Sequence, residues 1–385
     1  MLRRMVGVAS ALALAWSLFV FVTNGTAISI GAIRISSTDP IRPLVAAALL
    51  AAIYVLASGP RRTQRIREDA ALASRPATSS RLAVVLSAVI GIIAISQSSY
   101  TASGADAYAY VTQADLLLAG RLTVPVPIAN EVPWPTPLST FVPFGYSAVA
   151  GESAIASAVG PGLPLLMALF KAIGGHTALF LVVPMTAALL VWSTFAIGRT
   201  LGSSSLGLGA AWLTATSPAF LTMVKEPMSD VPAAAFWALA TWKALDASRW
   251  STVLSGVAAA IAILIRPNLV PLAAVIGGWM LWPRGDQSVR ARVRSFVVFS
   301  VPIALACVVI ASINQALFGS PVASGYGAAD QLFSNANVLT NVRRYGAWLV
   351  ETQTPLIFAG LVALIVPASR LWPASGAQRG WGAVA

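Results

Sequence analysis

An aspartate followed by two tyrosines is the stretch of the chain best suited to acid–base chemistry. Asp106, Tyr108 and Tyr110 follow an apolar run at residues 82–95 and open a polar, proline-rich segment. A carboxylate at a membrane surface could accept the proton of an attacking hydroxyl group. Two simpler interpretations stay open: the aspartate could cap a short helix, and the tyrosines could belong to the aromatic belt of a membrane–water boundary.

Two further groups of polar residues could take part in the same chemistry. Glu226 and Asp230 add two carboxylates in one turn, and Arg266 and Asn268 lie in a short connection between two apolar segments. Ionisable groups at membrane depth are costly and usually functional, and an arginine there can bind a phosphate through two parallel hydrogen bonds. The alternatives are that Asp230 caps a helix and that Arg266 only reaches toward lipid head groups.

The elements that must position these residues are membrane helices. Of the 385 residues, 57% are hydrophobic and 10% are charged, and the mean hydropathy is +0.78. Soluble domains carry about 25% charged residues, so we expect an all-α polytopic membrane protein. The single cysteine, Cys307, excludes an intramolecular disulfide and a cysteine metal cluster. The net charge of +12 fits an arginine excess that sets membrane topology, and no nucleic-acid partner is expected.

Several apolar segments approach or exceed the roughly 18–20 residues that a membrane-spanning helix needs, and about ten spans, some of them short, are expected. They lie at residues 5–22, 44–57, 82–97, 178–197, 206–224, 233–245, 253–265, 269–282, 296–313 and 355–372. The first is expected to be a retained anchor rather than a cleaved signal peptide, because a second span soon follows. Both termini are then cytoplasmic.

The distribution of charge predicts the orientation of these spans. Two basic loops, at 61–81 and 284–294, are expected in the cytoplasm. The resulting topology has 17 Lys and Arg residues inside and 8 outside, whereas 4 acidic residues lie inside and 9 outside. This agrees with the positive-inside rule. It brings Asp106, the turn at Glu226 and Asp230, and Arg266 to the outer membrane face.

A long outer loop, at about 98–175, follows Asp106. Its repeated prolines, in VPVP at 124–127 and VPWPTP at 132–137, argue against regular helix or sheet and predict extended segments against the membrane face. Residues 160–171 predict a proline-initiated interfacial helix, too short to span, with Lys171 near the head groups. His176, flanked by glycines and a threonine, is expected to be a loop residue rather than a ligand.

The order and sidedness of four motifs resemble the membrane-embedded glycosyltransferases with the C-type (GT-C) fold. The motifs are DAYAY at 106–110 with GRL at 120–122, PGLPLLM at 161–167, SPAF at 217–220 with MSDVP at 228–232, and IRPN at 265–268 with FGSP at 318–321. The most similar groups are protein O-mannosyltransferases and lipid A aminoarabinose transferases. The resemblance covers about 82–326.

The resemblance implies a polyprenyl-phosphate-linked sugar donor and an inverting transfer. The family's first-loop aspartate matches Asp106, and its second acid matches Asp230. Two departures occur. Ala107 stands where the mannosyltransferases have glutamate, so protein mannosylation is not specifically implied. Gly160 replaces the first proline of the interfacial motif.

The predicted function is therefore transfer of a hexose or pentose at the outer, periplasmic face of a bacterial cytoplasmic membrane. The predicted partners are the lipid-linked sugar, membrane lipids, and a glycan, lipid or protein acceptor. No metal is predicted, although the acids leave room for a divalent ion. The predicted catalytic residues are Asp106 and Asp230, and the predicted substrate-binding residues are Tyr108, Tyr110, Glu226, Arg266 and Asn268.

Three parts of the chain are expected: a transmembrane hairpin with a basic loop at 1–81, the glycosyltransferase domain at 82–372, and a short cytoplasmic tail at 373–385. The alternative function is that of a transporter or flippase for a lipid or amphiphile. The long outer loop favours the enzyme. The lack of an internal repeat disfavours the transporter, because many transporters contain inverted repeats.

Overall fold

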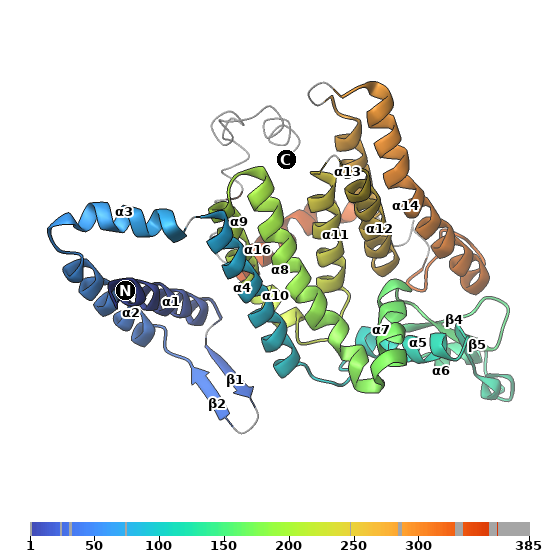
Figure 1. Cartoon of the computed structure of the whole chain (residues 1–385). Coiled ribbons are helices and arrows are strands. Elements are labelled where there is room, and N and C mark those ends of the chain that lie inside the picture. Colours follow the sequence, from blue (N-terminus) through green and yellow to red (C-terminus); the bar gives the residue numbers. More distant parts are fainter. Residues whose placement is uncertain are drawn as a thin grey trace.

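The computed structural model describes residues 2–23, 25–30, 33–73, 75–246, 248–283, 287–327, 334–353 and 360. Most of these residues are helical. A bundle of long helices forms the centre of the molecule, and short helices and a small sheet lie at one end of it (Figure 1). An N-terminal hairpin lies beside the bundle.

The N-terminal hairpin consists of α1 (Leu2–Thr23) and α2 (Ile41–Ala57), joined by the antiparallel strands β1 (Thr26–Ile30) and β2 (Ile33–Ser37). It continues into η1 (Gly59–Arg61) and the basic helix α3 (Arg62–Ala73).

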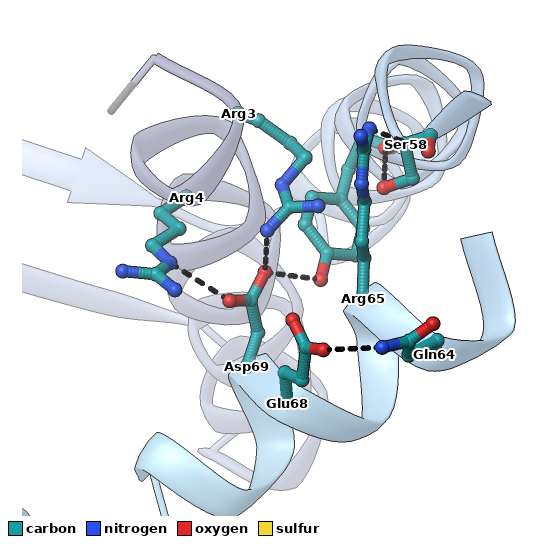
Figure 2. A network of polar contacts seen from close by, with 8 residues as sticks. Arg3, Arg4, Ser58, Gln64, Arg65, Glu68 and Asp69 are labelled. Carbon is teal, nitrogen blue, oxygen red and sulfur yellow. Dashed lines mark hydrogen bonds and ion pairs between the residues drawn. The ribbon is translucent and has the colours of Figure 1, made fainter. Parts of the chain in front are cut away.

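One acidic residue joins the three helices of this hairpin. Asp69 on α3 accepts hydrogen bonds from Arg3 Nη2 at 2.9 Å, Arg4 Nε at 2.8 Å and Tyr54 Oη at 2.9 Å (Figure 2). Arg65 also donates to the Ser58 carbonyl oxygen, at 2.9 Å. The N-terminus and the basic loop, both predicted to be cytoplasmic, therefore lie at the same end of the hairpin.

The bundle is packed through small residues. Its helices are α4 (Pro76–Gln97), α8 (Val182–Leu201), α9 (Ser204–Ala215), α10 (Pro218–Met223), α11 (Asp230–Ala244), α12 (Arg249–Ile265), α13 (Pro271–Leu281) and α14 (Val289–Phe318). A Cβ atom at Gly256 of α12 would lie 2.5 Å from the Phe299 carbonyl oxygen of α14, and one at Gly207 of α9 would lie 2.4 Å from that of Phe195 on α8. Such close backbone approach is how membrane helices associate.

Among the residues that the structure describes, four helices are long and apolar enough to cross a membrane: Leu2–Phe21, Pro76–Gln97, His176–Leu201 and Val289–Phe318. A fifth counts if Ile41–Ala57 and Gly59–Asp69, bent by 111°, form one span. These helices confirm a multi-pass, mostly helical membrane protein, whereas the total of about ten spans stays a prediction. The predicted tenth span at 355–372, Gly360 apart, and the tail at 373–385 lie outside the described residues.

The predicted span at 206–224 is instead two helices, α9 and α10. Ser217 caps the second helix, because its Oγ accepts from the Phe220 amide at 3.4 Å, and Pro218 occupies the first turn of that helix. A proline is tolerated there but not in a helix interior.

The loop at 98–175, predicted to be outer, contains a sheet. The expectation that its proline run at 124–127 forms no regular structure is wrong, because Val124 and Pro125 lie in a strand. β3 (Thr123–Pro125) and β4 (Tyr146–Ala148) pair antiparallel with the central strand β5 (Ala154–Ser157). The only proline in these strands, Pro125, ends an edge strand, where a missing amide is tolerated. The helix expected at 160–171 is present as α7 (Gly162–Gly174), and its interfacial location stays a prediction.

The remaining elements are mostly short. They are α5 (Ala105–Leu118), η2 (Pro127–Asn130), α6 (Pro137–Phe141), η3 (His176–Leu181), η4 (Pro267–Leu269), η5 (Asn335–Asn337) and α16 (Val338–Gln353). In Figure 1, α5, α6, α7 and the sheet lie at the lower end of the bundle, and α3 lies level with its upper end.

Candidate active site

Asp106 lies in the first turn of α5 at the lower end of the bundle. Gly104, with φ of +91°, precedes the helix, a backbone conformation that glycine adopts without strain. Gly145, with φ of +86°, packs against the same turn, because a Cβ atom there would lie 2.6 Å from the Ala105 carbonyl oxygen. Tyr110 follows Asp106 by four residues and is therefore on the same helix face. The loop around Gly145 thus holds the start of α5 in place.

A salt bridge joins the second acid to the arginine. Asp230 is the first residue of α11, and Arg266 directly follows α12. Asp230 Oδ1 and Arg266 Nη2 are 2.9 Å apart, and Arg266 Nε donates to Ser229 Oγ at 2.8 Å. The Arg266 and Asp230 side chains are 36% and 38% exposed, so both remain within reach of a ligand.

Backbone contacts fix the position of Arg266. A Cβ atom at Gly160 would lie 2.7 Å from the Ile265 carbonyl oxygen, and one at Gly162 would lie 2.4 Å from the Ile265 amide nitrogen. The start of α7 therefore packs directly on the chain that leads into Arg266. This contact gives a physical reason for Gly160, the residue that departs from the proline of the resembling family: no side chain fits there.

Tyr110 lies among the charged residues of both groups. Burial raises the pKa of its phenol, and the negative charges of Asp106 and Asp230 add to this effect, whereas a hydrogen bond with Ser229 and the charge of Arg266 oppose it. Tyr110 is almost fully buried. The structure thus brings four of the seven predicted residues together: Asp106, Tyr110, Asp230 and Arg266.

The other three predicted residues lie around this cluster. Tyr108 is two positions from Asp106, which points it to another side of α5, and its ring centroid is 6.2 Å from that of Tyr146. Glu226 accepts a hydrogen bond from Ser103 Oγ at 2.6 Å. Asn268 is exposed in η4.

Tyr326 is a site residue that the sequence did not reveal. Its hydroxyl donates to Asp106 Oδ1 at 3.3 Å. Partial burial, and next the charge of Asp106, raise the pKa of Tyr326, so the hydroxyl keeps its proton at neutral pH. The only local signal is the Ser-Gly-Tyr-Gly turn at 324–327, which gives no indication of a partner more than 200 residues earlier.

A second contact holds α5 against the interfacial helix. Lys171 on α7 forms an ion pair with Asp115 on α5, and its Nζ is 3.2 Å from Nδ1 of His176. Lys171 therefore serves an interhelical contact rather than only facing head groups. Among the residues that the structure describes, no three His, Cys, Asp or Glu side chains are grouped so that they could hold a metal ion.

Comparison with known proteins gives one match. Residues 158–313 match the family model of the dolichyl-phosphate-mannose-protein mannosyltransferases. The matched range is less than half of the chain; it includes α7, Asp230 and Arg266 but neither Asp106 nor Tyr326. No curated protein and no solved structure matches the chain. The match supports the resemblance to GT-C glycosyltransferases and indicates a membrane glycosyltransferase of the mannosyltransferase-like kind.

Proposed function

We propose that the protein transfers a sugar from a polyprenyl-phosphate donor to an acceptor hydroxyl at the outer face of a bacterial cytoplasmic membrane. One observation carries this proposal: two carboxylates at one end of a membrane bundle have different partners, Asp230 an arginine and Asp106 a tyrosine hydroxyl. In such a pair, one carboxylate can orient the arginine that binds an anionic donor, and the other can accept a proton.

Asp106 is the base in this proposal. A neighbouring positive charge favours the ionised form of a carboxylate and makes it a weaker proton acceptor. Asp230 has such a charge at 2.9 Å. Asp106 instead accepts a hydrogen bond from a neutral hydroxyl, so we assign the proton transfer to Asp106 and not to the ion-paired Asp230. The acceptor hydroxyl would transfer its proton to Asp106 as its oxygen attacks the sugar.

Arg266 binds the donor phosphate in this proposal. A guanidinium has five N–H donors in a planar fork, and Asp230 and Ser229 orient Arg266 through two of its nitrogens. As the acceptor oxygen forms its bond to the anomeric carbon, the bond from that carbon to the phosphate oxygen breaks. The phosphate leaves with the electron pair, and Arg266 stabilises its charge. A single displacement of this kind inverts the anomeric centre.

The outer location rests on charge and on the arrangement of the ends. The loop with α3 is rich in arginine, which favours the cytoplasm. The elements that carry the proposed site lie at the other end of the bundle (Figure 1). A donor with a lipid tail would reach them from the bilayer.

The test uses the purified full chain in lipid nanodiscs with a panel of radiolabelled polyprenyl-phosphate sugars and hydroxyl acceptors. We expect product with inverted configuration, and loss of product in Asp106→Asn. Glu152→Gln, an exposed carboxylate in the same outer loop, is the matched control and should stay active. Absence of transfer from every donor, or full activity of both Asp106→Asn and Asp230→Asn, would refute the proposal and favour the transporter.

A further inference from the structure

The segment after α14 folds back onto the first outer loop. Gly319, with φ of +75°, ends α14, and the Ala150 amide donates to the Leu317 carbonyl oxygen at 2.9 Å. Ser147 Oγ on β4 donates to the Gly325 carbonyl oxygen. A Cβ atom at Gly325 would lie 2.3 Å from Cα of Ala158. The turn that carries Tyr326 is therefore docked on the sheet by backbone contact.

The turn itself is closed by reciprocal hydrogen bonds. The Ser324 amide donates to the Gly327 carbonyl oxygen at 3.1 Å, and the Gly327 amide donates to that of Ser324 at 2.9 Å. Tyr326 projects from this closed turn with its hydroxyl 3.3 Å from Asp106 Oδ1. An anchored turn holds the hydroxyl in one place, so the hydroxyl can orient a carboxylate that stands on another element.

We propose that Tyr326 is a positioning residue that holds Asp106 through Oδ1 and leaves Oδ2 to accept the proton of the acceptor. This inference rests on the proposed function and adds a role for the second outer segment. A carboxylate in the first turn of a helix can rotate about its side-chain bonds. Fixing one oxygen reduces the number of orientations that the carboxylate samples, so the other oxygen is more often in position for the proton transfer.

The electrostatic surroundings of Asp106 make the role measurable by pH. Tyr110 on its own helix and Tyr326 interact directly with Asp106, and Asp230 at the start of α11 and Arg266 after α12 act on the same Tyr110. The Tyr326→Phe variant keeps Tyr110, Asp230 and Arg266, so only the Tyr326 hydroxyl is removed. Because a hydrogen bond to the ionised form favours that form, removing the Tyr326 hydroxyl should move the acid limb of the rate profile to higher pH. A purely structural role would not move it.

The experiment compares Tyr326→Phe with the wild type in nanodiscs, measuring kcat, KM for the donor, and kcat/KM from pH 4 to 9. We expect kcat to fall about 10–100-fold, as for loss of a hydrogen bond to a charged group. Donor KM should change little, and the acid limb should move to higher pH. Tyr100→Phe is the matched control. Its hydroxyl donates to the Ile95 carbonyl oxygen at 3.1 Å, so the profile should be unchanged.

A second variant tests the docked turn without changing the tyrosine. Ser147→Ala removes the side-chain contact to Gly325 and should move the acid limb in the same direction by a smaller amount, with thermal unfolding monitored for each variant. An active wild type with an unchanged Tyr326→Phe profile would overturn this inference alone. A wild type that transfers no sugar from any donor would overturn the proposed function, and this inference with it.

Discussion

Replacing Arg266 by lysine separates phosphate binding from folding. The Arg266–Asp230 pair is more than one-third exposed on each side, and exposed pairs contribute no more than about 1 kcal/mol to folding. A lysine keeps the positive charge but has a single nitrogen, so it cannot contact Asp230, Ser229 and a phosphate with the fork geometry of arginine. Arg266→Lys should therefore fold and insert while binding the donor more weakly.

The expected loss follows from the contacts of the guanidinium. A hydrogen bond to a charged group contributes about 1.5–3 kcal/mol. Because the Arg266 side chain is 36% exposed, we take the lower part of that range. Arg266→Lys should cost roughly 1.5 kcal/mol, or about tenfold in Kd, and Arg266→Ala roughly 2 kcal/mol, or about 30-fold.

The assay is equilibrium binding of a polyprenyl phosphate to the full chain in nanodiscs, with the phosphate-free polyprenol as the ligand control. Affinity for the polyprenol should be the same in all variants, because the change acts on the phosphate alone. Arg42→Lys, an exposed arginine of the N-terminal hairpin, is the protein control. Equal polyprenyl-phosphate affinity of wild type and Arg266→Ala would show that Arg266 only reaches for head groups.

Three further predictions concern catalysis, packing and topology. Asp106→Asn should fold and bind donor but lose transfer by about 10²–10⁴-fold, and a dead Asp230→Asn beside an active Asp106→Asn would reverse the two roles. Gly162→Ala should lower stability by about 1–3 kcal/mol, because its Cβ would lie 2.4 Å from the Ile265 nitrogen; an unchanged unfolding midpoint would contradict this contact. A topology reporter fused at Pro133 should be active only outside the cytoplasm, and activity only inside would remove the basis for an outer site.

Much of the candidate site could be predicted because local sequence features mark its residues. Asp106, Asp230 and Arg266 are charged residues at the ends of apolar segments. Because burying a charge near a membrane is costly, a charged residue at such a position indicates a function. Charge asymmetry predicted that they share one side, and the structure brings them together through Tyr110. Tyr108 shows the limit of sequence proximity, because two residues along a helix turn a side chain to another face.

The remaining features depend on contacts that local patterns do not carry. Tyr326 meets Asp106 across 220 positions, and tyrosine in a glycine turn has no pattern specific to catalysis. The sheet is not predicted because the prolines at 124–127 argue against a strand there, and the short, proline-free central strand Ala154–Ser157 has no pattern that pairs it with that segment. Ser217 and Pro218 fit the pattern of a helix cap followed by a proline in the first turn, which indicates a break between two helices. The apolar run around them instead suggests one continuous span.

The Asp69 contact with the N-terminal arginines has a consequence for biosynthesis. Asp69 leaves the ribosome after both α1 and α2, so its ion pairs with Arg3 and Arg4 form only once the hairpin has been made. Until then the two arginines are unneutralised and can retain the N-terminus in the cytoplasm, as the positive-inside rule predicts. The later pairing neutralises part of that charge and fastens α3. On the predicted topology, the same two side chains would act in sequence, first as a topogenic signal and then as the ion-pair partners that hold α3.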